Sequence, residues 1–420
     1  MPAVYGLIDG NAFYCSAERA FAPDLRGRPV IVLSNNDGCA IARTAEAKAL
    51  GIKMGDAWHL IRGRPGMREV RWFSSNYALY GDMSRRVYQV LAARVPRVEP
   101  YSIDEFFLDL DVPGCPAALS HALRAEVRQA TKIPTCVGLG PTKTIAKLAN
   151  AYAKADPRME GVCDLREERH RATLYAGTPV GEVWGIGGRT VEKLAERGVA
   201  TVAAFAAMPA DQVRDLLTVV GARVQAELRG VSCLPLSLMA PTRKGIAVTR
   251  SFGQPVTAWP VMREAVAAYA ARAGEKLRAE GLQAGHLTVF LHTNPHRADE
   301  VWHSGQRGAR IEPTADTRDL IREAVRLLEP LWREGCRFFK AGVMLDDLSV
   351  PQVQARLFPT RSPEASRRAM AALDAVNAVH GAGTLRPAST GLARAWSTRA
   401  ARRSPRYTTR LEEIMGARAL

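Results

Sequence analysis

The stretch "PYSIDEFFLDLD", residues 100–111, places two adjacent acids in front of a run of large apolar side chains. Side chains of a β-strand alternate between its two faces, so Glu105 is expected on one face and Asp104 on the other. Taken alone, two such acids indicate no more than a polar loop before a buried strand. Their meaning depends on the rest of the chain.

A third acid ends a second apolar run. The segment "VYGLIDGNAFYCSAE" contains a short strand pattern that stops at Asp9, and a helix is expected over residues 12–20. Two strands of one sheet that each deliver a carboxylate near an end would form a pocket of hard oxygen donors. Mg²⁺ binds such pockets through one or two carboxylates together with substrate phosphates. A magnesium site built from these acids is therefore a testable hypothesis.

The composition is that of a globular, basic protein. The chain has 420 residues, 47% of them hydrophobic, which is enough for two to four domains. Its formal net charge is +16 and its sequence pI is about 9.9. Such a balance favours a polyanionic partner, with nucleic acid ahead of an anionic membrane surface.

The sequence also bears on the compartment. No apolar run approaches the roughly 20 residues that span a bilayer, and the N-terminal segment lacks the pattern of a signal peptide. The seven cysteines are scattered, without a Cys-x-x-Cys pair, so neither a disulfide framework nor a zinc site is indicated. We expect a cytoplasmic protein with reduced cysteines.

Strand and helix patterns alternate from residue 1 to about 167, which predicts an α/β or α+β unit. The strand patterns are "VYGLI", "PVIVLS", "EVRWFS", "EFFLDLD" and "TCVGLG". The helical patterns are "NAFYCSAERAF", "ARTAEAKALG", "NYALYGDMSRRVYQVLAARV", "CPAALSHALRAEVRQAT" and "TKTIAKLANAYAKA".

A glycine-rich turn enters a helix in "TPVGEVWGIGGRTVEKLAERGVATV", residues 178–202. This pattern is typical of a helix-hairpin-helix, in which a turn such as that of Gly185, Gly187 and Gly188 presents backbone N–H groups to a phosphate without reading sequence. The alternative is a plain tight turn between two helices, because glycines also serve geometry alone.

The composition changes around residues 236–245, where prolines and basic residues predict a linker. Beyond it, "AGHLTVFLHTN" and "RFFKAGVMLDDLS" predict strands, and "PVMREAVAAYAARAGEKLRAE" and "DTRDLIREAVRLLEPLWREG" predict helices of a second, smaller α+β domain. Residues 385–420 hold eight Arg against two Glu. We expect part of this tail to order only on a partner.

The chain resembles, nearly end to end, the Y-family of lesion-bypass DNA polymerases, and most closely the UmuC type, the class of the catalytic subunit of bacterial DNA polymerase V. The resemblance rests on several blocks in the correct order. They are "DGNAFYCSAE", "VLSNNDGCAIARTAEAKALGIKMGD", "FSSNYALYGDMS", "YSIDEFFLDL", "TKTIAKLANAYAK", "VWGIG" and "SPRYTTR".

The resemblance implies an α+β multidomain, right-hand architecture with a ferredoxin-like palm, small fingers, a helical thumb with a helix-hairpin-helix, and an α+β little finger. The implied division is palm at residues 1–20 and 74–167, fingers at 21–73, thumb at 168–236, linker at 237–244, little finger at 245–350, and a C-terminal tail at 351–420.

The resemblance also implies the chemistry of the site. In that family the acids matching Asp9, Asp104 and Glu105 hold two Mg²⁺ ions for attack of a primer 3′-hydroxyl on an incoming nucleotide. Because neighbouring strand residues diverge, a bend or a strand end must re-aim one of the paired acids. Tyr14 matches the steric gate, a ring under the sugar that clashes with a 2′-hydroxyl; the alternative is a core aromatic, which we expect for Phe13.

Two lysines match triphosphate-binding positions of the family, Lys48 in the fingers and Lys154 in the last palm helix. Many family members carry Tyr and Arg where this chain has Ala45 and Lys48, and Ala155 replaces a frequent proline. These departures leave the individual phosphate contacts open.

Ile41 and Ala42 match the roof over the templating base pair, where small side chains leave room for damaged bases. Ordinary packing is the alternative for both. Near the C-terminus, "QARLF" resembles a clamp-binding peptide, with Gln354, Leu357 and Phe358 as its contact residues. A motif of five residues is a weak signal, but it follows the last domain, where an exposed Leu-Phe pair has no core to join.

The expected function is thus template-directed, error-prone translesion DNA synthesis of low processivity in the SOS response to DNA damage. The main alternative is a catalytically silent relative that binds damaged DNA and recruits other polymerases. A palm-fold nucleotidyl cyclase or a nuclease would also use acids and Mg²⁺. A small-molecule cyclase needs neither the basic charge nor the thumb turn, and nothing beyond the acids supports a nuclease.

The resemblance implies several partners: primed or damaged DNA, deoxynucleoside triphosphates, the sliding clamp, a UmuD-like dimer and a recombinase filament. No membrane partner is expected. The protein is expected in the cytoplasm, associated with the nucleoid.

Overall fold

The structure is a computed structural model, which describes residues 4–239, 242–297, 299–351, 362–392, 394, 396–414 and 416. Its contacts divide the chain into two compact units, which are described separately. Unit 1 holds residues 1–240 and 402–420, and unit 2 holds residues 241–401. Within the described ranges, no helix combines the length and apolar character needed to cross a bilayer.

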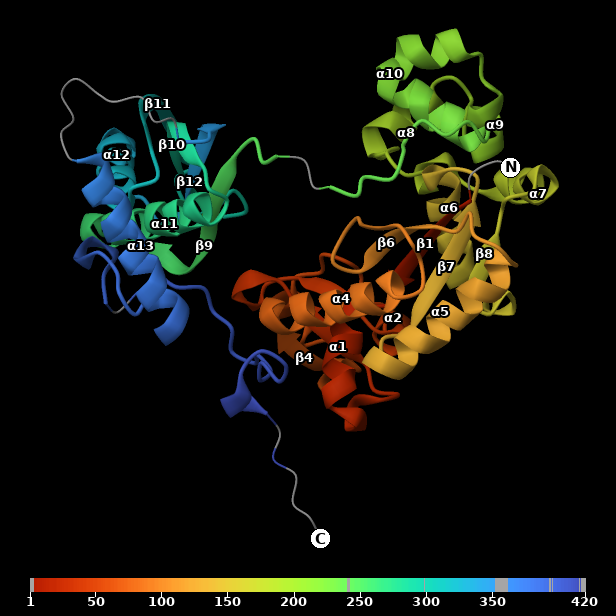
Figure 1. Cartoon of the computed structure of the whole chain (residues 1–420), viewed down its shortest axis with the longest axis horizontal. Coiled ribbons are helices and arrows are strands. Elements are labelled where there is room, and N and C mark those ends of the chain that lie inside the picture. The colour runs from red at the N-terminus through yellow and green to blue at the C-terminus, as the bar shows by residue number, and fades with distance from the viewer. Residues whose placement is uncertain are drawn as a thin grey trace. The chain divides into compact units, whose positions relative to one another are not determined.

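Unit 1 is built on a five-stranded sheet with the strand order β5-β6-β1-β7-β8 (Figure 1). Strand β1 (Tyr5–Gly10) lies at its centre, antiparallel to β6 (Glu105–Asp109) and to β7 (Thr135–Gly140). The edge strands are β5 (Val98–Pro100), antiparallel to β6, and β8 (Val162–Asp164), parallel to β7. The central strands are runs of buried residues, as expected for strands covered on both faces.

Helices cover both faces of this sheet. Helices α4 (Tyr77–Ala92) and α5 (Pro116–Thr131) share one core with the strands, and α6 (Lys143–Ala155) packs on β1 and β7 from the other side. The backbone of α6 comes so close that a Cβ at Gly138 would overlap the carbonyl oxygen of Ala146. Glycine at this strand position therefore sets the distance between α6 and the sheet.

A smaller sheet with the order β3-β2-β4 follows the first helix in sequence. Strand β2 pairs antiparallel with β3 and parallel with β4. The short helices α2 and α3 belong to the same region, whose core includes Trp58 and Ile31. The elements are α1 (Phe13–Phe21), β2 (Val30–Leu33), β3 (Ala40–Arg43), α2 (Ala45–Ala49), α3 (Trp58–Ile61) and β4 (Arg71–Ser74).

A helical group completes unit 1 (Figure 1). Its helices are α7 (Glu168–Gly177), α8 (Gly188–Ala195), α9 (Val202–Ala207) and α10 (Ala210–Leu228). It is anchored through the fully buried Glu227, whose carboxylate accepts backbone N–H groups from Thr144, at 3.0 Å, and from Leu234, at 3.1 Å. Because Thr144 lies in the first turn of α6, the anion is stabilised by the positive end of that helix.

Unit 2 contains a four-stranded antiparallel sheet with the order β11-β10-β12-β9. Helices α11 and α12 pack on it and bury one apolar core. Helix α13 joins this unit through an ion pair between Asp374 and Arg278, at 2.6 Å. The elements are β9 (Ile246–Val256), α11 (Trp259–Ala279), β10 (Gln283–Thr293), β11 (Ser304–Thr314), α12 (Thr317–Leu328), β12 (Phe338–Ser349) and α13 (Pro363–His380).

The predicted α+β fold is confirmed, and each of the five strand patterns before residue 167 forms a strand. Five strands of the described structure, β3, β5, β8, β9 and β11, were not predicted. In β9 buried and exposed residues alternate irregularly, and in β11 no residue is buried. Neither strand therefore has the apolar pattern from which strands are recognised in a sequence.

The described residues of the C-terminal region pack on this chain: α13 lies in unit 2, and residues 402–414 belong to unit 1. That part of residues 385–420 orders only on a partner stays a prediction, because residues 393, 395, 415 and 417–420 lie outside the described residues. The chain thus passes from unit 1 to unit 2 near residue 240 and returns near residue 401.

Candidate active site

Three acids lie where the middle strands of the large sheet meet. Asp9, near the end of β1, is paired in register with Glu105, the first residue of β6. Asp104 precedes β6 in a bend, and its carbonyl oxygen accepts the backbone N–H of Gly10 at 2.9 Å. Asp104 therefore stands outside the regular strand, where the alternation of side chains between the two faces does not fix its direction.

Lysines of α6 contact two of these acids. Lys154 Nζ lies 2.6 Å from Asp9 Oδ2, and Lys147 Nζ lies 2.6 Å from Glu105 Oε1. Asp9 and Glu105 share the sheet face of Leu7 and Phe107, on which α6 packs. The helix therefore delivers positive charge to the same side of the sheet that carries the carboxylates.

The electrostatics of Asp9 reflect this crowding. Burial raises the pKa of Asp9 to about 6, with Lys154 acting in the opposite direction and the charges of Asp104 and Glu105 adding to the rise. The raised pKa means that the surroundings of Asp9 disfavour its negative charge more than water does. A nearby cation would lower its pKa.

The third acid, Asp104, is held by its own loop. Its Oδ1 accepts the hydroxyl of Ser102 at 2.7 Å, and no ion pair to it occurs in the described part of the chain. Its side chain is only partly buried.

A divalent metal ion would find oxygen donors at these residues. Within the described residues, no three His, Cys, Asp or Glu side chains form a ready-made metal cluster. The donors are nevertheless all carboxylate oxygens, the type that Mg²⁺ prefers. The ammonium groups of Lys147 and Lys154 supply the positive charge that the acids require here. The residues present thus fit a hard cation.

Tyr14 lies in an aromatic cluster at the start of α1. Its ring stacks on Tyr80 with a centroid distance of 4.5 Å and meets Tyr77 edge to face at 6.1 Å. Tyr14 is only half-buried, whereas the neighbouring Phe13 is buried in the core. Phe13 is thus the core aromatic that the sequence predicts, whereas Tyr14 is partly accessible and also packs against that core, so its role as a steric gate stays a prediction.

Three further predicted site residues lie on α2 and β3. Lys48 is exposed at the end of α2, and the structure shows no ion pair for it in the described ranges. Ile41 and Ala42 are on β3, where Ile41 is partly exposed and Ala42 is buried. Both also contact the core that contains Phe13, so ordinary packing is not eliminated for either residue.

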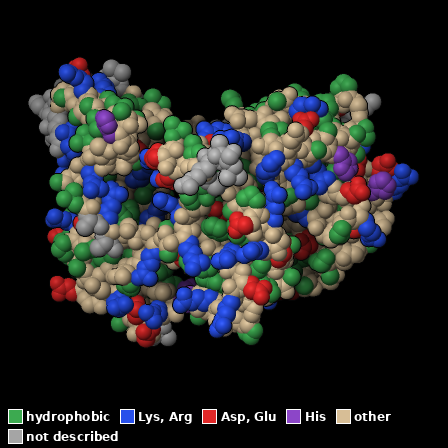
Figure 2. Space-filling model, turned by 90° about the horizontal axis from the view of Figure 1, so that it is seen from below, with side chains coloured by type: hydrophobic (Ala, Val, Ile, Leu, Met, Phe, Trp, Pro, Cys, Tyr) green, Lys and Arg blue, Asp and Glu red, His purple; other side chains and the backbone are tan. Residues whose placement is uncertain are grey.

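The glycine-rich turn has the geometry of a tight entry to α8. Gly185 has a φ of +89°, which favours glycine, and Gly187 is the N-cap of the helix that begins at Gly188. A Cβ at Gly187 or Gly188 would meet nothing within 4 Å, so the backbone there is open to an incoming group. Figure 2 shows Lys and Arg side chains spread widely over the face that it presents, with acids in smaller groups.

The predicted clamp-binding peptide and Lys147 complete the comparison of the sequence with the structure. Gln354, Leu357 and Phe358 lie outside the described residues. Lys147, by contrast, contacts an acid of the site although the sequence did not single it out. Its signal was the recurrence of Lys143, Lys147 and Lys154 at spacings of four and seven, which places them on one face of a helix.

Family models match most of the chain. The impB/mucB/samB family matches residues 8–151, and the C-terminal domain of that family matches residues 243–357. A domain of unknown function matches residues 367–417.

Several curated relatives are similar over most of their length. Protein UmuC of Salmonella typhimurium (strain LT2) is 43% identical over 419 residues, 98% of this chain and 99% of the relative. Protein MucB of Escherichia coli is 40% identical over 413 residues, 97% of each chain. DNA polymerase IV 1 of Bacillus subtilis (strain 168) is 28% identical over 339 residues, 78% of each chain.

A solved structure, a Y-family DNA polymerase chimera of Dbh and Dpo4, superposes with a TM-score of 0.67 at 19% identity. The match covers 83% of this chain and 100% of that one. The fold is therefore the right-hand α+β fold of that structure, as the resemblance predicted.

Proposed function

This chain belongs to the impB/mucB/samB family, and we propose that it is a template-directed DNA polymerase of translesion synthesis that adds deoxynucleotides to a primer 3′ end. The observation that carries the proposal is the pairing of Asp9 with Glu105 beside Asp104, on a sheet backed by lysines. The names of the relatives, among them DNA polymerase IV 1, support it.

Asp9, Asp104 and Glu105 would hold two Mg²⁺ ions, with Asp9 and Asp104 serving both. When bound, such ions lower the pKa of the attacking hydroxyl and neutralise charge on the phosphates. The carboxylate oxygens keep the donor set hard, and burial of Asp9 strengthens its attraction for positive charge.

Other side chains bind and orient the substrate. Lys48 and Lys154 provide point charges for the triphosphate, and Lys154 already lies at the acids. Tyr14 lies under the sugar and excludes a 2′-hydroxyl, supported from behind by Tyr80. Ile41 and Ala42 roof the templating base pair, where their modest size leaves room for a lesion.

The turn at Gly185, Gly187 and Gly188 binds a DNA phosphate through backbone N–H groups. The net charge of +16 supports sequence-independent binding of the duplex. In the cell we place the protein in the cytoplasm, on the nucleoid, in the SOS response. Its further partners would be a sliding clamp, bound through Gln354, Leu357 and Phe358, a UmuD-like dimer and a recombinase filament.

The alternative function is a catalytically silent accessory protein that recruits other polymerases to damaged DNA. The retention of all three acids, and of lysines that contact two of them, favours the polymerase. A binding protein would need neither.

Primer extension tests the proposal. Wild type and Asp104→Ala are compared on an undamaged primed template with Mg²⁺ and deoxynucleotides, alone and then with clamp and a UmuD-like partner. Asp111→Ala, which removes an exposed acid just after β6, is the matched control. We expect extension by the wild type and the control and none by Asp104→Ala. Salt-dependent DNA binding without extension by the wild type under either condition would favour the accessory protein.

A further inference from the structure

The domain of unknown function ends in a segment that packs on unit 1; we call residues 402–410 the C-terminal clip. It begins with a two-way contact to β4: Ser74 N–H donates to the carbonyl of Arg402 at 3.1 Å, and Arg402 N–H donates to Ser74 Oγ at 3.0 Å. The guanidinium of Arg402 lies over the ring of Trp72, 4.7 Å from its centroid. The clip is therefore joined to the strand by its backbone and a side chain.

The middle of the clip is buried at the start of α4. The amide of Asn76 donates to the carbonyl of Ser404 at 2.9 Å, to Ser404 Oγ at 2.9 Å and to the carbonyl of Pro405 at 3.1 Å. Asn76 is 1% exposed and Ser404 is 8% exposed. Further along, the ring of Tyr407 stacks on Phe21 of α1 with a centroid distance of 4.8 Å. These contacts fix the register of the clip.

The clip leads to Tyr14 through one buried carboxylate. Glu18 of α1 is 2% exposed, and its Oε1 accepts the hydroxyl of Tyr80 at 2.6 Å and that of Ser404 at 3.0 Å. The ring of Tyr80 stacks on Tyr14. A continuous chain of contacts therefore runs from Ser404 through Glu18 and Tyr80 to the ring of Tyr14.

We propose that the C-terminal clip positions Tyr14 and so takes part in the selection of the nucleotide sugar. A steric gate discriminates only if its ring holds its place when a 2′-hydroxyl presses on it. The stacked ring of Tyr80 supplies that support, and Ser404 helps to hold Glu18, which in turn holds the hydroxyl of Tyr80. This inference rests on the proposed polymerase function, and it gives the domain of unknown function a role in that site.

Single-nucleotide incorporation tests the inference. The ratio of kcat/KM for a deoxynucleotide to that for the matching ribonucleotide is measured for wild type and Ser404→Ala. Ser404→Ala removes the hydrogen bond that Ser404 Oγ donates to Glu18 and the one that it accepts from Asn76. This loss is expected to lower the ratio about fivefold, with kcat/KM for the deoxynucleotide within about twofold. Ser404→Thr keeps the hydroxyl and should restore the ratio. Thr409→Ala, an exposed hydroxyl of the same clip, is the matched control.

A double-mutant cycle tests the route. If Ser404 acts through Glu18 and Tyr80, Ser404→Ala and Tyr80→Phe together should lower the ratio by less than the product of the separate effects. An unchanged ratio in Ser404→Ala, with normal extension, overturns the inference and leaves the polymerase intact. If the wild type never extends a primer, the proposed function fails. Amide exchange in residues 13–21, unchanged between wild type and Ser404→Ala, would then also overturn the positioning role.

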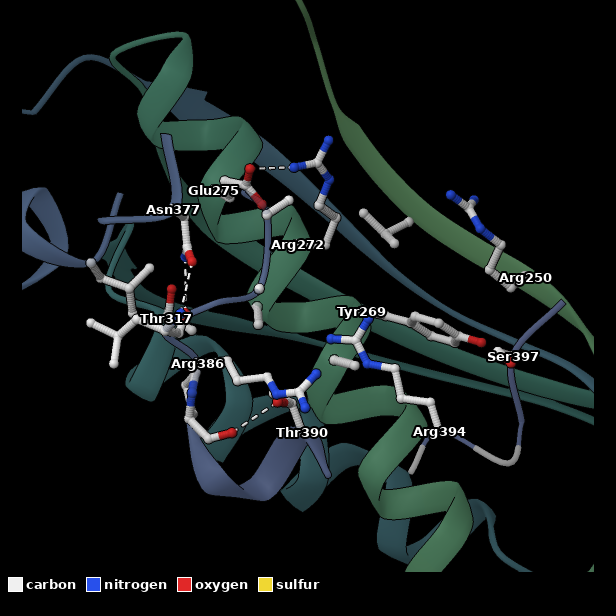
Figure 3. Close-up of a pocket in the computed structure, with 18 of the residues that line it drawn as sticks. Arg250, Tyr269, Arg272, Glu275, Thr317, Asn377, Arg386, Thr390, Arg394 and Ser397 are labelled. Carbon is white, nitrogen blue, oxygen red and sulfur yellow. Dashed lines mark hydrogen bonds and ion pairs between the residues drawn. The ribbon is translucent and has the colours of Figure 1, made fainter. Parts of the chain in front are cut away.

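A second, independent feature is a cavity of about 370 Å³ within unit 2, lined by α11, β9 and the segment that follows α13 (Figure 3). Its volume is that of a small-molecule site. Figure 3 shows the guanidinium groups of Arg386 and Arg394 reaching the space beside Tyr269. The cavity is thus built jointly by the core of unit 2 and the domain of unknown function.

The lining of this cavity has unmatched positive charge. Arg272 and Arg278 are paired with acids, but no ion pair engages the partly buried Arg386 or Arg394 in the described part of the chain. The lining also contains two buried polar atoms that lack a hydrogen-bond partner in the described structure, the hydroxyl of Tyr269 and Nε of Arg394. Tyr269 is 3% exposed.

We infer that this cavity binds a phosphate-bearing ligand. Half-buried guanidinium groups without acid partners are costly, and a phosphate satisfies them with paired, charge-assisted hydrogen bonds. The hydroxyl of Tyr269 would donate to a further phosphate oxygen. The phosphate could come from a free nucleotide or from a nucleic-acid backbone.

Titration of the full chain with dATP and with a short single-stranded oligonucleotide distinguishes the two sources. Calorimetry is done on wild type, Arg386→Ala with Arg394→Ala, and Arg333→Ala, an exposed control in the same unit. We expect one probe to bind the wild type more tightly than the other, and that probe identifies the source of the phosphate. Its binding should be about tenfold or more weaker in the double variant and unchanged in the control. If the double variant binds each probe as tightly as the wild type does, the inference is overturned.

Discussion

Two buried carboxylates of unit 1 lie in contrasting surroundings. Asp9 forms an ion pair with Lys154 and lies beside two further acids, whereas Glu18 accepts hydrogen bonds from the hydroxyls of Tyr80 and Ser404. Burial raises the pKa of both, to about 6 for Asp9 and about 7 for Glu18. Only Asp9 has a cationic partner.

The two sites differ in the property of the carboxylate that its partners use: its charge at Asp9 and its position as a hydrogen-bond acceptor at Glu18. At Asp9 a negative charge has a cationic partner in Lys154, and a metal ion would be a second one, although burial outweighs Lys154 and leaves the pKa raised. The surroundings of Glu18 require an acceptor at a fixed place, since two neutral hydroxyls depend on it. Replacing each acid by its isosteric amide therefore tests the contrast directly, because an amide keeps the shape and an acceptor but removes the charge.

The largest effect is expected for Asp9→Asn. Removing the charge removes a ligand for positive charge at the reacting phosphate, which is worth several kcal/mol, so primer extension should fall by roughly 10³-fold or more. Steady-state primer extension measures the loss, with Asp111→Asn as the exposed control. Near-normal extension by Asp9→Asn would mean that Asp9, like Glu18, serves position alone.

Tyr14→Ala should have the next largest effect, and on selectivity rather than on rate. Without the ring, the 2′-hydroxyl of a ribonucleotide meets no steric barrier, and discrimination should fall by about 10²-fold. Incorporation of matched deoxy- and ribonucleotides measures it. Tyr88→Ala removes a tyrosine of α4 whose ring lies against Phe106, and it should leave discrimination unchanged. A fall in both variants would point to general loosening of the fold.

The two carboxylates also differ in how far sequence could identify them. Asp9, Asp104 and Glu105 end or begin apolar strand runs, so local pattern was enough to bring them together as a hypothesis. Glu18 lies within a helix pattern, and its partner Ser404 is 386 residues away in sequence. No periodicity specifies such a contact, because it depends on the path by which the C-terminal segment returns to unit 1.

The strands β6 and β7, which the sequence predicts, also differ in burial from β11, which it does not predict. β6 and β7 are recognisable because helices bury both of their faces, which requires continuous apolar runs. β11 pairs only with β10 and has no buried residue, so its sequence is free to be polar and glycine-rich. Basic composition in the tail indicated a segment without a core, although clip residues such as Ser404 find their core in unit 1.

Glu18→Gln should change stability more than catalysis. The raised pKa of Glu18 means that the folded state binds more protons than the unfolded state between about pH 4.5 and about pH 7. The free energy of unfolding of the wild type should therefore fall as pH rises through that window, by on the order of 3 kcal/mol from this group.

Glutamine at residue 18 removes this contribution, so the gap between variant and wild type should shift in favour of the variant as pH rises. Urea unfolding at pH 5 and pH 8 measures the shift. A constant gap would show that Glu18 titrates alike in both states. We also expect Glu18→Gln to extend primers at nearly the wild-type rate, which would show that synthesis needs the charge of Asp9 but not that of Glu18.

The smallest effect is expected for Lys48→Ala. Lys48 is exposed and forms no ion pair in the described ranges, so its attraction for a triphosphate is screened by water and salt. KM for the deoxynucleotide should rise about threefold with little change in kcat, and the rise should shrink at high ionic strength. Lys53→Ala, a nearby exposed lysine, should not change KM. If Lys48→Ala lowered kcat as strongly as Asp9→Asn, the positive charge of Lys48 would act on the reacting phosphate itself, and charge would be needed at α2 as well as at the acids.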